Sequence, residues 1–126
     1  MSLYQYKGTI RRVIDGDTLE VDVALGFYIT KTIRVRLRGI NAPEPRGETR
    51  EAGIVSASAL VARIRQVAGL SHPNADEELA RIGAPCTLQS FRGKSFDRWV
   101  AEVTVDGSLK TLGEWMVENG FAEDTE

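Results

Sequence analysis

The chain of 126 residues contains one cysteine, Cys86, and one histidine, His72. A single cysteine cannot form an internal disulfide, and neither residue type is frequent enough for a zinc cluster or a histidine-based triad. No apolar run approaches the roughly 18 residues of a membrane-spanning helix, so no membrane partner is expected. Residues 1–7 also lack the apolar segment of a signal peptide. The compartment stays open: the chain is expected to be cytoplasmic as it stands, or secreted if its N-terminus has been trimmed.

An excess of positive charge is also missing. The chain has 16 Lys and Arg against 18 Asp and Glu, a formal net charge of −2, with 42% hydrophobic residues. Such a composition is typical of an ordinary globular protein and excludes a uniformly basic nucleic-acid-coating domain. The length fits one domain covering residues 1–126. Nothing in the sequence indicates an obligate dimer, so a monomer is expected.

The first third of the chain alternates apolar and polar residues, which predicts strands at residues 4–14, 18–23 and 32–38. Residues 24–29, which include Gly26, are expected to form a hairpin connection or a bulged strand. Two further strands are expected at 86–91 and 98–105, joined through a turn at Gly93-Lys94. Cys86 opens the first of these two and is expected to be a small buried residue.

Two other segments have helical periodicity. Apolar residues recur at three- and four-residue steps over 48–68, and Gly69 is expected to end this helix. A second amphipathic helix is expected at 109–119, with Leu109 among the residues considered for its core face and Gly120 as its end. Residues 71–85 read as a surface insertion in which 76–82 could form a short helix. The order of elements predicts an α+β, mainly β protein: a closed five-stranded barrel with two or three packed helices.

Asp15-Gly16-Asp17 places two carboxylates at the expected end of the first strand. Carboxylate oxygens are the ligands that calcium and magnesium prefer. Asp-Gly is also common in hairpin turns for backbone reasons alone, and for this short motif by itself the turn is the favoured interpretation.

Arg34, Arg36 and Arg38 lie on one face of the strand at 32–38. Guanidinium groups bind phosphates through paired hydrogen bonds, so a row of them suits a phosphate chain as a substrate-binding surface. The alternative is a solvated strand face whose charges are balanced by acids on a neighbouring strand.

Glu44 follows in a loop stiffened by Pro43 and Pro45. A general base needs a fixed position, which such a loop provides. The alternative is a surface carboxylate near the start of the following helix. Arg98 is similarly open, either as a phosphate ligand or as the partner of a nearby acid. Together, paired carboxylates, a fixed Glu and two separated arginines are what metal-assisted phosphodiester hydrolysis requires.

Four segments of the chain resemble the staphylococcal nuclease (thermonuclease) family. They are residues 13–18 (VIDGDT), 36–44 (RLRGINAPE), 96–101 (FDRWVA) and 112–122 (LGEWMVENGFA). The resemblance implies an OB-type barrel and calcium-dependent cleavage of DNA and RNA that leaves 3′-phosphate ends. It implies as catalytic residues Arg36, Glu44 and Arg98, and as calcium ligands Asp17, Asn41 and the backbone carbonyl of Ala42, with Asp15 behind them.

The chain departs from the family pattern at several positions. Asn41 stands where a ligand aspartate is usual, which should weaken calcium binding and leaves room for another divalent metal. Asp97 precedes Arg98 where Gly is frequent. Ser95 and Phe96 occupy substrate-binding positions where the best-known member has Lys and Tyr. The third helix of the longer members is also missing.

The main hypothesis is therefore a calcium-dependent nuclease acting on single-stranded or frayed DNA or RNA. Two alternatives stay open. One is a non-catalytic OB-type module that binds nucleic acid or protein. The other is a calcium site that only stabilises the fold.

Overall fold

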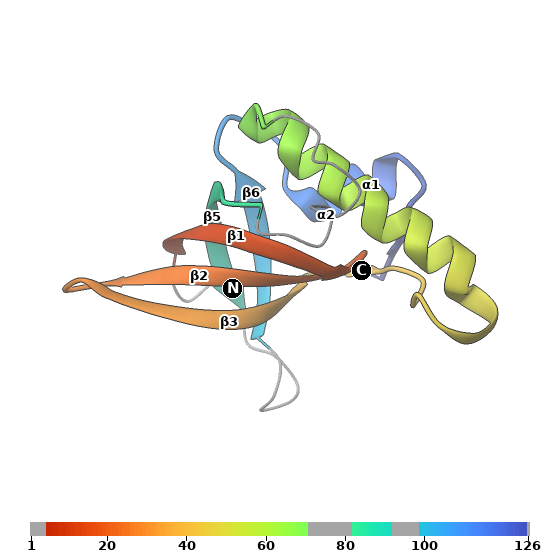
Figure 1. Cartoon of the computed structure of the whole chain (residues 1–126), viewed down its shortest axis with the longest axis horizontal. Helices are drawn as coiled ribbons and strands as arrows, with labels where there is room; N and C mark the ends of the chain where they lie inside the picture. Colours follow the sequence, from red (N-terminus) through yellow and green to blue (C-terminus); the bar gives the residue numbers. More distant parts are fainter. Residues whose placement is uncertain (1–4, 71–81, 92–98, 126) are drawn as a thin grey trace.

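The structure, a computed structural model, describes residues 5–70, 82–91 and 99–125. Five of its strands form a closed barrel with the neighbour order β1-β2-β3-β6-β5. The barrel strands are β1 (Gln5–Asp15), β2 (Thr18–Gly26), β3 (Ile29–Leu37), β5 (Ala84–Phe91) and β6 (Trp99–Val105). All neighbouring strands are antiparallel except β3 and β6, which are parallel. Helices α1 (Arg50–Ala68) and α2 (Leu112–Glu118) lie together on one side of the barrel (Figure 1). The predicted fold class, a five-stranded OB-type barrel with packed helices, is confirmed.

Period-two alternation explains the barrel core. Leu19 and Val21 of β2 are fully buried, as is Val103 of β6, whereas their polar neighbours along each strand are partly exposed. Leu60 and Ile64 of α1 are also fully buried and belong to the same core. One apolar stripe of α1 therefore covers the barrel, as the three- and four-residue spacing predicted. Of the helices in the described ranges, none combines the length and apolar character needed to span a bilayer.

The ends of the two helices follow ordinary capping chemistry. Gly69 ends α1 with a φ of 72°, in the left-handed region that glycine adopts without a Cβ penalty. The Thr111 side chain accepts a hydrogen bond from the Glu114 N–H and caps α2. Because α2 begins at Leu112, the predicted start at 109 was wrong, and Leu109 is fully exposed rather than facing the core.

Two short strands outside the barrel were not predicted. β4 (Ile40–Asn41) pairs antiparallel with β7 (Glu123–Asp124), so that Asn41 lies opposite Glu123. Thr125 extends this pairing by donating its N–H to the Gly39 carbonyl at 2.9 Å. Two-residue strands carry no alternation that a sequence pattern could detect.

Several other boundaries differ from the prediction. A 3-10 turn, η1 (Gly47–Thr49), precedes α1, so the α-helix begins at Arg50 instead of residue 48. β5 begins at Ala84 and includes Pro85, because proline is tolerated near the start of a strand. Cys86 is fully buried, as expected. The remaining predictions for 71–81 and 92–98, including the short helix, His72 and the Gly93-Lys94 turn, lie outside the described residues.

Candidate functional site

The Asp15-Gly16-Asp17 turn connects β1 to β2 at the end of the barrel that faces the N-terminal half of α1. The Asp17 N–H donates to Oδ1 of Asp15 at 3.2 Å, which closes the turn. A Cβ built on Gly16 would lie 2.1 Å from Oγ of Ser56 on α1 and 2.8 Å from Cβ of Ala42. Glycine is therefore required here by close packing, and this packing fixes both aspartates relative to the helix.

Asp17 is the most enclosed acid of the site, with a relative exposure of 8%. Its Oδ2 accepts the backbone N–H of Ala42 at 3.0 Å, and its Oδ1 accepts the hydroxyl of Thr18 at 3.1 Å. Nη2 of Arg36 lies 3.8 Å from Oδ2. The carboxylate thus ties the end of β3 and the loop after β4 to the turn between β1 and β2.

The two aspartates influence each other's protonation. Burial, followed by the hydrogen bond with Asp17, raises the pKa of Asp15 to about 6. Burial also opposes ionisation of Asp17, but hydrogen bonds from Asp15, the Ala42 N–H and Thr18, together with the Arg36 charge, outweigh it and lower the pKa of Asp17. Below about pH 6 the pair shares one proton, and above it two adjacent negative charges are present.

Arg36 projects from β3 into the same end of the barrel. Its Nη2 donates to Oδ1 of Asn41 at 3.1 Å and to the Ile40 carbonyl at 3.5 Å, besides its contact with Asp17. The side chain is still 35% exposed, so part of the guanidinium faces solvent. An arginine held on one side and open on the other is suited to bind an anion.

Glu44 lies in the loop between β4 and η1, and the backbone of this loop is tightly held. A Cβ on Gly53 of α1 would lie 2.4 Å from the Glu44 carbonyl carbon and 2.4 Å from the Pro45 nitrogen. The Thr49 hydroxyl donates to the Glu44 carbonyl at 2.7 Å. The side chain itself is 70% exposed, with Oε2 3.8 Å from Nε of Arg46. The fixed position predicted for Glu44 holds for its backbone.

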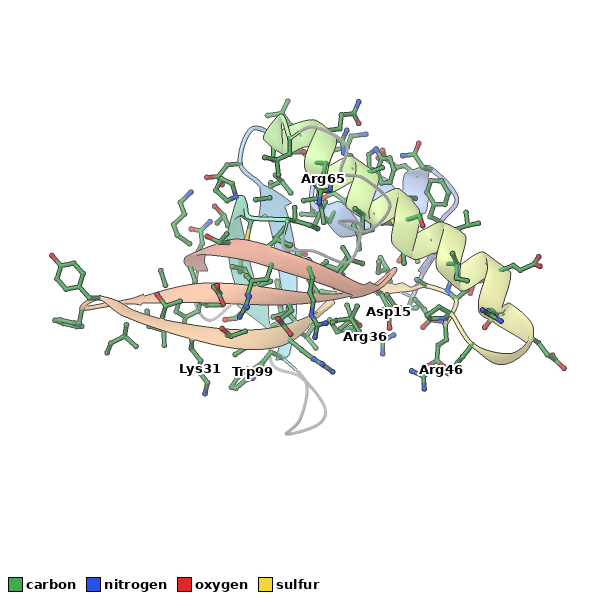
Figure 2. The ribbon with its side chains drawn as sticks, in the orientation of Figure 1. Asp15, Lys31, Arg36, Arg46, Arg65 and Trp99 are labelled. Carbon is green, nitrogen blue, oxygen red and sulfur yellow. The ribbon has the colours of Figure 1, made fainter. Side chains whose placement is uncertain are left out.

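The C-terminal segment supports the other side of this loop. The pairing of β7 with β4 holds Asn41, and Oγ of Ser56 donates to the Phe121 carbonyl at 2.8 Å. Ser56 therefore contacts both the aspartate turn and the C-terminal segment. Figure 2 shows Asp15, Arg36 and Arg46 at the end of the molecule where these elements meet.

The other predicted residues are distributed differently. Arg38 turns toward β5 and β6, with Nη1 3.2 Å from Oε1 of Glu102 and its guanidinium carbon 3.9 Å from the centre of the Phe91 ring. Arg34 is exposed on β3. The structure thus brings together Asp15, Asp17, Arg36, Asn41 and Ala42, with Glu44 in the adjoining loop. Ser95, Phe96 and Arg98 lie outside the described residues.

Sequence reasoning missed the residues that position the site. Gly53 left a signal, because a glycine in a helix interior is unfavourable and often marks close packing. Ser56 left none, since a serine on a helix has many ordinary explanations. The β4–β7 pairing had no signal either, because strands of two residues show no alternation.

The side chains that meet at the site supply oxygen atoms, the type of ligand that hard cations prefer. Asp15 and Asp17 supply carboxylate oxygens, and their mutual effect on pKa leaves negative charge that a divalent cation would neutralise. Asn41 adds an amide oxygen, which Arg36 contacts here. Among the described residues no cluster of three or more His, Cys, Asp or Glu side chains is present, so the fit depends on the amide and backbone oxygens as well.

The chain was compared with protein-family models and with curated proteins, and neither comparison finds a match. The fold and the geometry described above are therefore the basis for assigning a function.

Proposed function

We propose that this protein is a metal-dependent nuclease that hydrolyses single-stranded or frayed DNA or RNA. The observation that carries the proposal is the arrangement of Arg36, whose guanidinium is held by Asp17 and Asn41 and is still partly open to solvent. A phosphate bound by the open side of Arg36 would lie next to two coupled carboxylates. A phosphodiester with a bound metal needs both kinds of group, carboxylate oxygens for the cation and a guanidinium for the phosphate.

Each residue has a proposed part in the reaction. A calcium ion, or another divalent cation, would be held by Asp17, Asn41 and the Ala42 carbonyl, with Asp15 behind them, and would supply positive charge next to the phosphate. Glu44 accepts a proton from the attacking water, whose oxygen bonds to phosphorus while the bond to the 5′ oxygen breaks, and the leaving 5′ oxygen takes up a proton from solvent. Arg36, together with Arg98 by the sequence resemblance, stabilises charge on the phosphoryl oxygens. The products are a 3′-phosphate and a 5′-hydroxyl end.

Glu44→Gln tests the proposal directly. Loss of the base should lower the turnover of denatured DNA by about 10²–10⁴-fold, with the melting temperature unchanged, because the Glu44 side chain is exposed. Glu48→Gln is the matched control, since Glu48 is an exposed acid in the adjoining η1 turn. Calcium should be required and a chelator should abolish cleavage. Equal turnover of Glu44→Gln and wild type would contradict the assignment.

A second candidate is a non-catalytic nucleic-acid- or protein-binding module on the same barrel. The observation that favours it is Asn41, which replaces a potential third acid and contacts Arg36 through its amide oxygen. Incubation with denatured DNA separates the candidates. Fragments that depend on calcium support the nuclease, whereas an intact DNA band with reduced mobility supports the binding module.

A further inference from the structure

The hairpin that joins β2 to β3 carries an unusual group of side chains. We call residues 24–31 the arm. Leu25 is 45% exposed, Phe27 95%, Tyr28 108% and Ile29 55%. Figure 1 shows that the ends of β2 and β3 extend beyond the rest of the barrel, on the side away from the N-terminal half of α1. Four large apolar side chains therefore surround the tip of a projection that no described element covers.

The backbone at this tip is strained. Gly26 pairs with Ile29, so Phe27 and Tyr28 are the two central residues of a tight turn. Their φ angles are +53° and +61°, and they are the only non-glycine residues with positive φ in the described ranges. Two-residue hairpin turns of this kind strongly prefer Asn-Gly, because those residues tolerate the left-handed region. The turn itself therefore does not require aromatic residues.

The charged side chains on β3 and in the segments next to it are all positive. Residues 23–43 include four basic residues and no acid, in a chain whose net charge is −2. Within the described ranges neither Lys31 nor Arg34 forms an ion pair, whereas Arg36 and Arg38 contact acids. In Figure 2 Lys31 lies between Arg36 and the tip of the arm. Exposed aromatic residues that continue into a strand with exposed basic side chains are features that bind single-stranded nucleic acid.

We infer that the arm is an outlying binding site for the nucleic-acid strand whose phosphate reaches Arg36. Bases stack on Phe27 and Tyr28, and the backbone passes Arg34, which shares a strand face with Arg36, on its way to the site. The inference rests on the proposed function, because it defines the path of the same substrate. From Tyr28 to Arg36 the strand spans about 26 Å, which agrees with the roughly 4–16 nucleotides that an OB fold covers.

Two other occupants fit less well. Two copies of the chain that met through their arms would bring like charges together, because residues 23–43 contain four basic residues and no acid. A zwitterionic lipid surface would contact the apolar tip but would provide no excess of negative charge for the basic residues of β3. Base stacking needs only a few aromatic side chains and tolerates any sequence.

The test is the double variant Phe27→Asn/Tyr28→Gly. Binding of a labelled single-stranded DNA of about 12 nucleotides, a length within the range that an OB fold covers, is measured by fluorescence anisotropy in the presence of a chelator. The dissociation constant should rise by about 10–100-fold, because each lost stacking contact weakens binding several-fold. The melting temperature should rise at the same time, since Asn-Gly suits the turn. Loss of affinity would then not be due to unfolding. Leu109→Ala, which also removes a fully exposed apolar side chain, should bind as the wild type does.

Oligonucleotide length gives a second measurement. Wild-type affinity should increase from about 3 to about 12 nucleotides, because only the longer strand reaches the arm, and the double variant should lose this increase. Equal binding of the 12-nucleotide strand by variant and wild type would overturn the inference. Binding of phosphatidylcholine vesicles, or self-association, that is lost in the double variant while DNA binding is kept would also overturn it.

The outcomes separate this inference from the proposed function. If the wild type cleaves DNA in calcium but the double variant binds single-stranded DNA with the same affinity, the inference about the arm is wrong and the proposed nuclease activity stands. If the double variant loses affinity for DNA in chelator but the wild type produces no fragments in calcium, the inference about the arm is supported and the proposed nuclease activity is wrong.

Discussion

The two ends of the β2–β3 hairpin differ in almost every physical property. At one end, Asp17 and Arg36 contact each other as well as Ala42 and Asn41, and Asp17 is nearly buried. At the other end, Phe27 and Tyr28 are fully exposed in a strained turn. The same pair of strands thus positions one group of residues rigidly and leaves the other without any described contact. Rigid positioning suits chemistry at a fixed atom, whereas an open aromatic tip suits contact with a flexible chain.

Gly53→Ala should break the rigid end and have the largest effect. The new methyl group would lie 2.4–2.5 Å from backbone atoms of Glu44 and Pro45, which cannot move like a flexible side chain. We expect a loss of about 3 kcal/mol in the free energy of unfolding, at the upper end of overpacking effects. Urea denaturation measures this loss, and nuclease activity should fall with it because the Glu44 loop is displaced.

Whether Gly53→Ala lowers or raises the free energy of unfolding is decisive for the packing of Gly53. Helix propensity alone favours alanine over glycine by about 1 kcal/mol. Ser58→Ala on an exposed position of α1 is the matched control and should change stability by less than about 0.5 kcal/mol. Stabilisation by Gly53→Ala would show that the helix and the Glu44 loop are not packed as described.

Asp15→Asn tests whether the ionised Asp15 carboxylate, at the rigid end of the hairpin, lowers the free energy of unfolding at neutral pH. The folded state raises the pKa of Asp15 from 3.8 to about 6, so it binds the proton more tightly than the unfolded chain does. The stability this group contributes is therefore full below about pH 4 and is lost as the pH rises through 6. Asparagine keeps the acceptor for the Asp17 N–H without ionising.

The expected result for Asp15→Asn is a gain of about 1 kcal/mol at pH 8, after allowance for solvent screening, and almost none at pH 4. Thermal denaturation in chelator at both pH values measures it. Asp106→Asn removes an exposed acid that lies 3.7 Å from Lys7 and should give small changes at either pH. The same gain for Asp15→Asn at both pH values would contradict a raised pKa of Asp15 in the folded protein.

Arg38→Lys should have the smallest effect. Lysine keeps the charge next to Glu102 but loses the planar stacking of the guanidinium over Phe91. We expect a loss of about 0.5–1 kcal/mol in the free energy of unfolding. Arg34→Lys on the same strand, where no ion pair is present within the described ranges, should change stability less. Equal urea midpoints for the two variants would show that the Arg38 contacts contribute nothing.

The sequence predicted the barrel well because each long strand alternates and each helix has an apolar stripe. Leu19 and Val21 follow the first pattern, and Leu60 and Ile64 follow the second. The end of α1 was predictable because glycine at 69 has a clear physical role there. The start of α2 was not, because Leu109 has the right spacing for the helix and only the Thr111 cap shows where the helix begins.

The candidate site was predictable to the extent that it depends on neighbours along the chain. The aspartate turn and the Asn41–Glu44 loop are each local, and their residue types indicated their chemistry. The contacts that join them are long-range, such as Gly16 against Ser56, and a single sequence has no period or spacing that encodes them. The strained backbone at Phe27 was not predicted either, because Gly26 next to it is the residue expected in an ordinary turn.

The pairing of β4 with β7 has a consequence for the order of events during folding. Asn41 gains its strand partner from residues near the other end of the described chain. Contacts between residues so distant in sequence form slowly, because a long loop must close before they contribute. The hairpins β1–β2 and β2–β3, with the aspartate turn between β1 and β2, close only short loops and can form first. The loop that holds Asn41 is therefore completed late, so a folding chain would form its local hairpins before its complete candidate site.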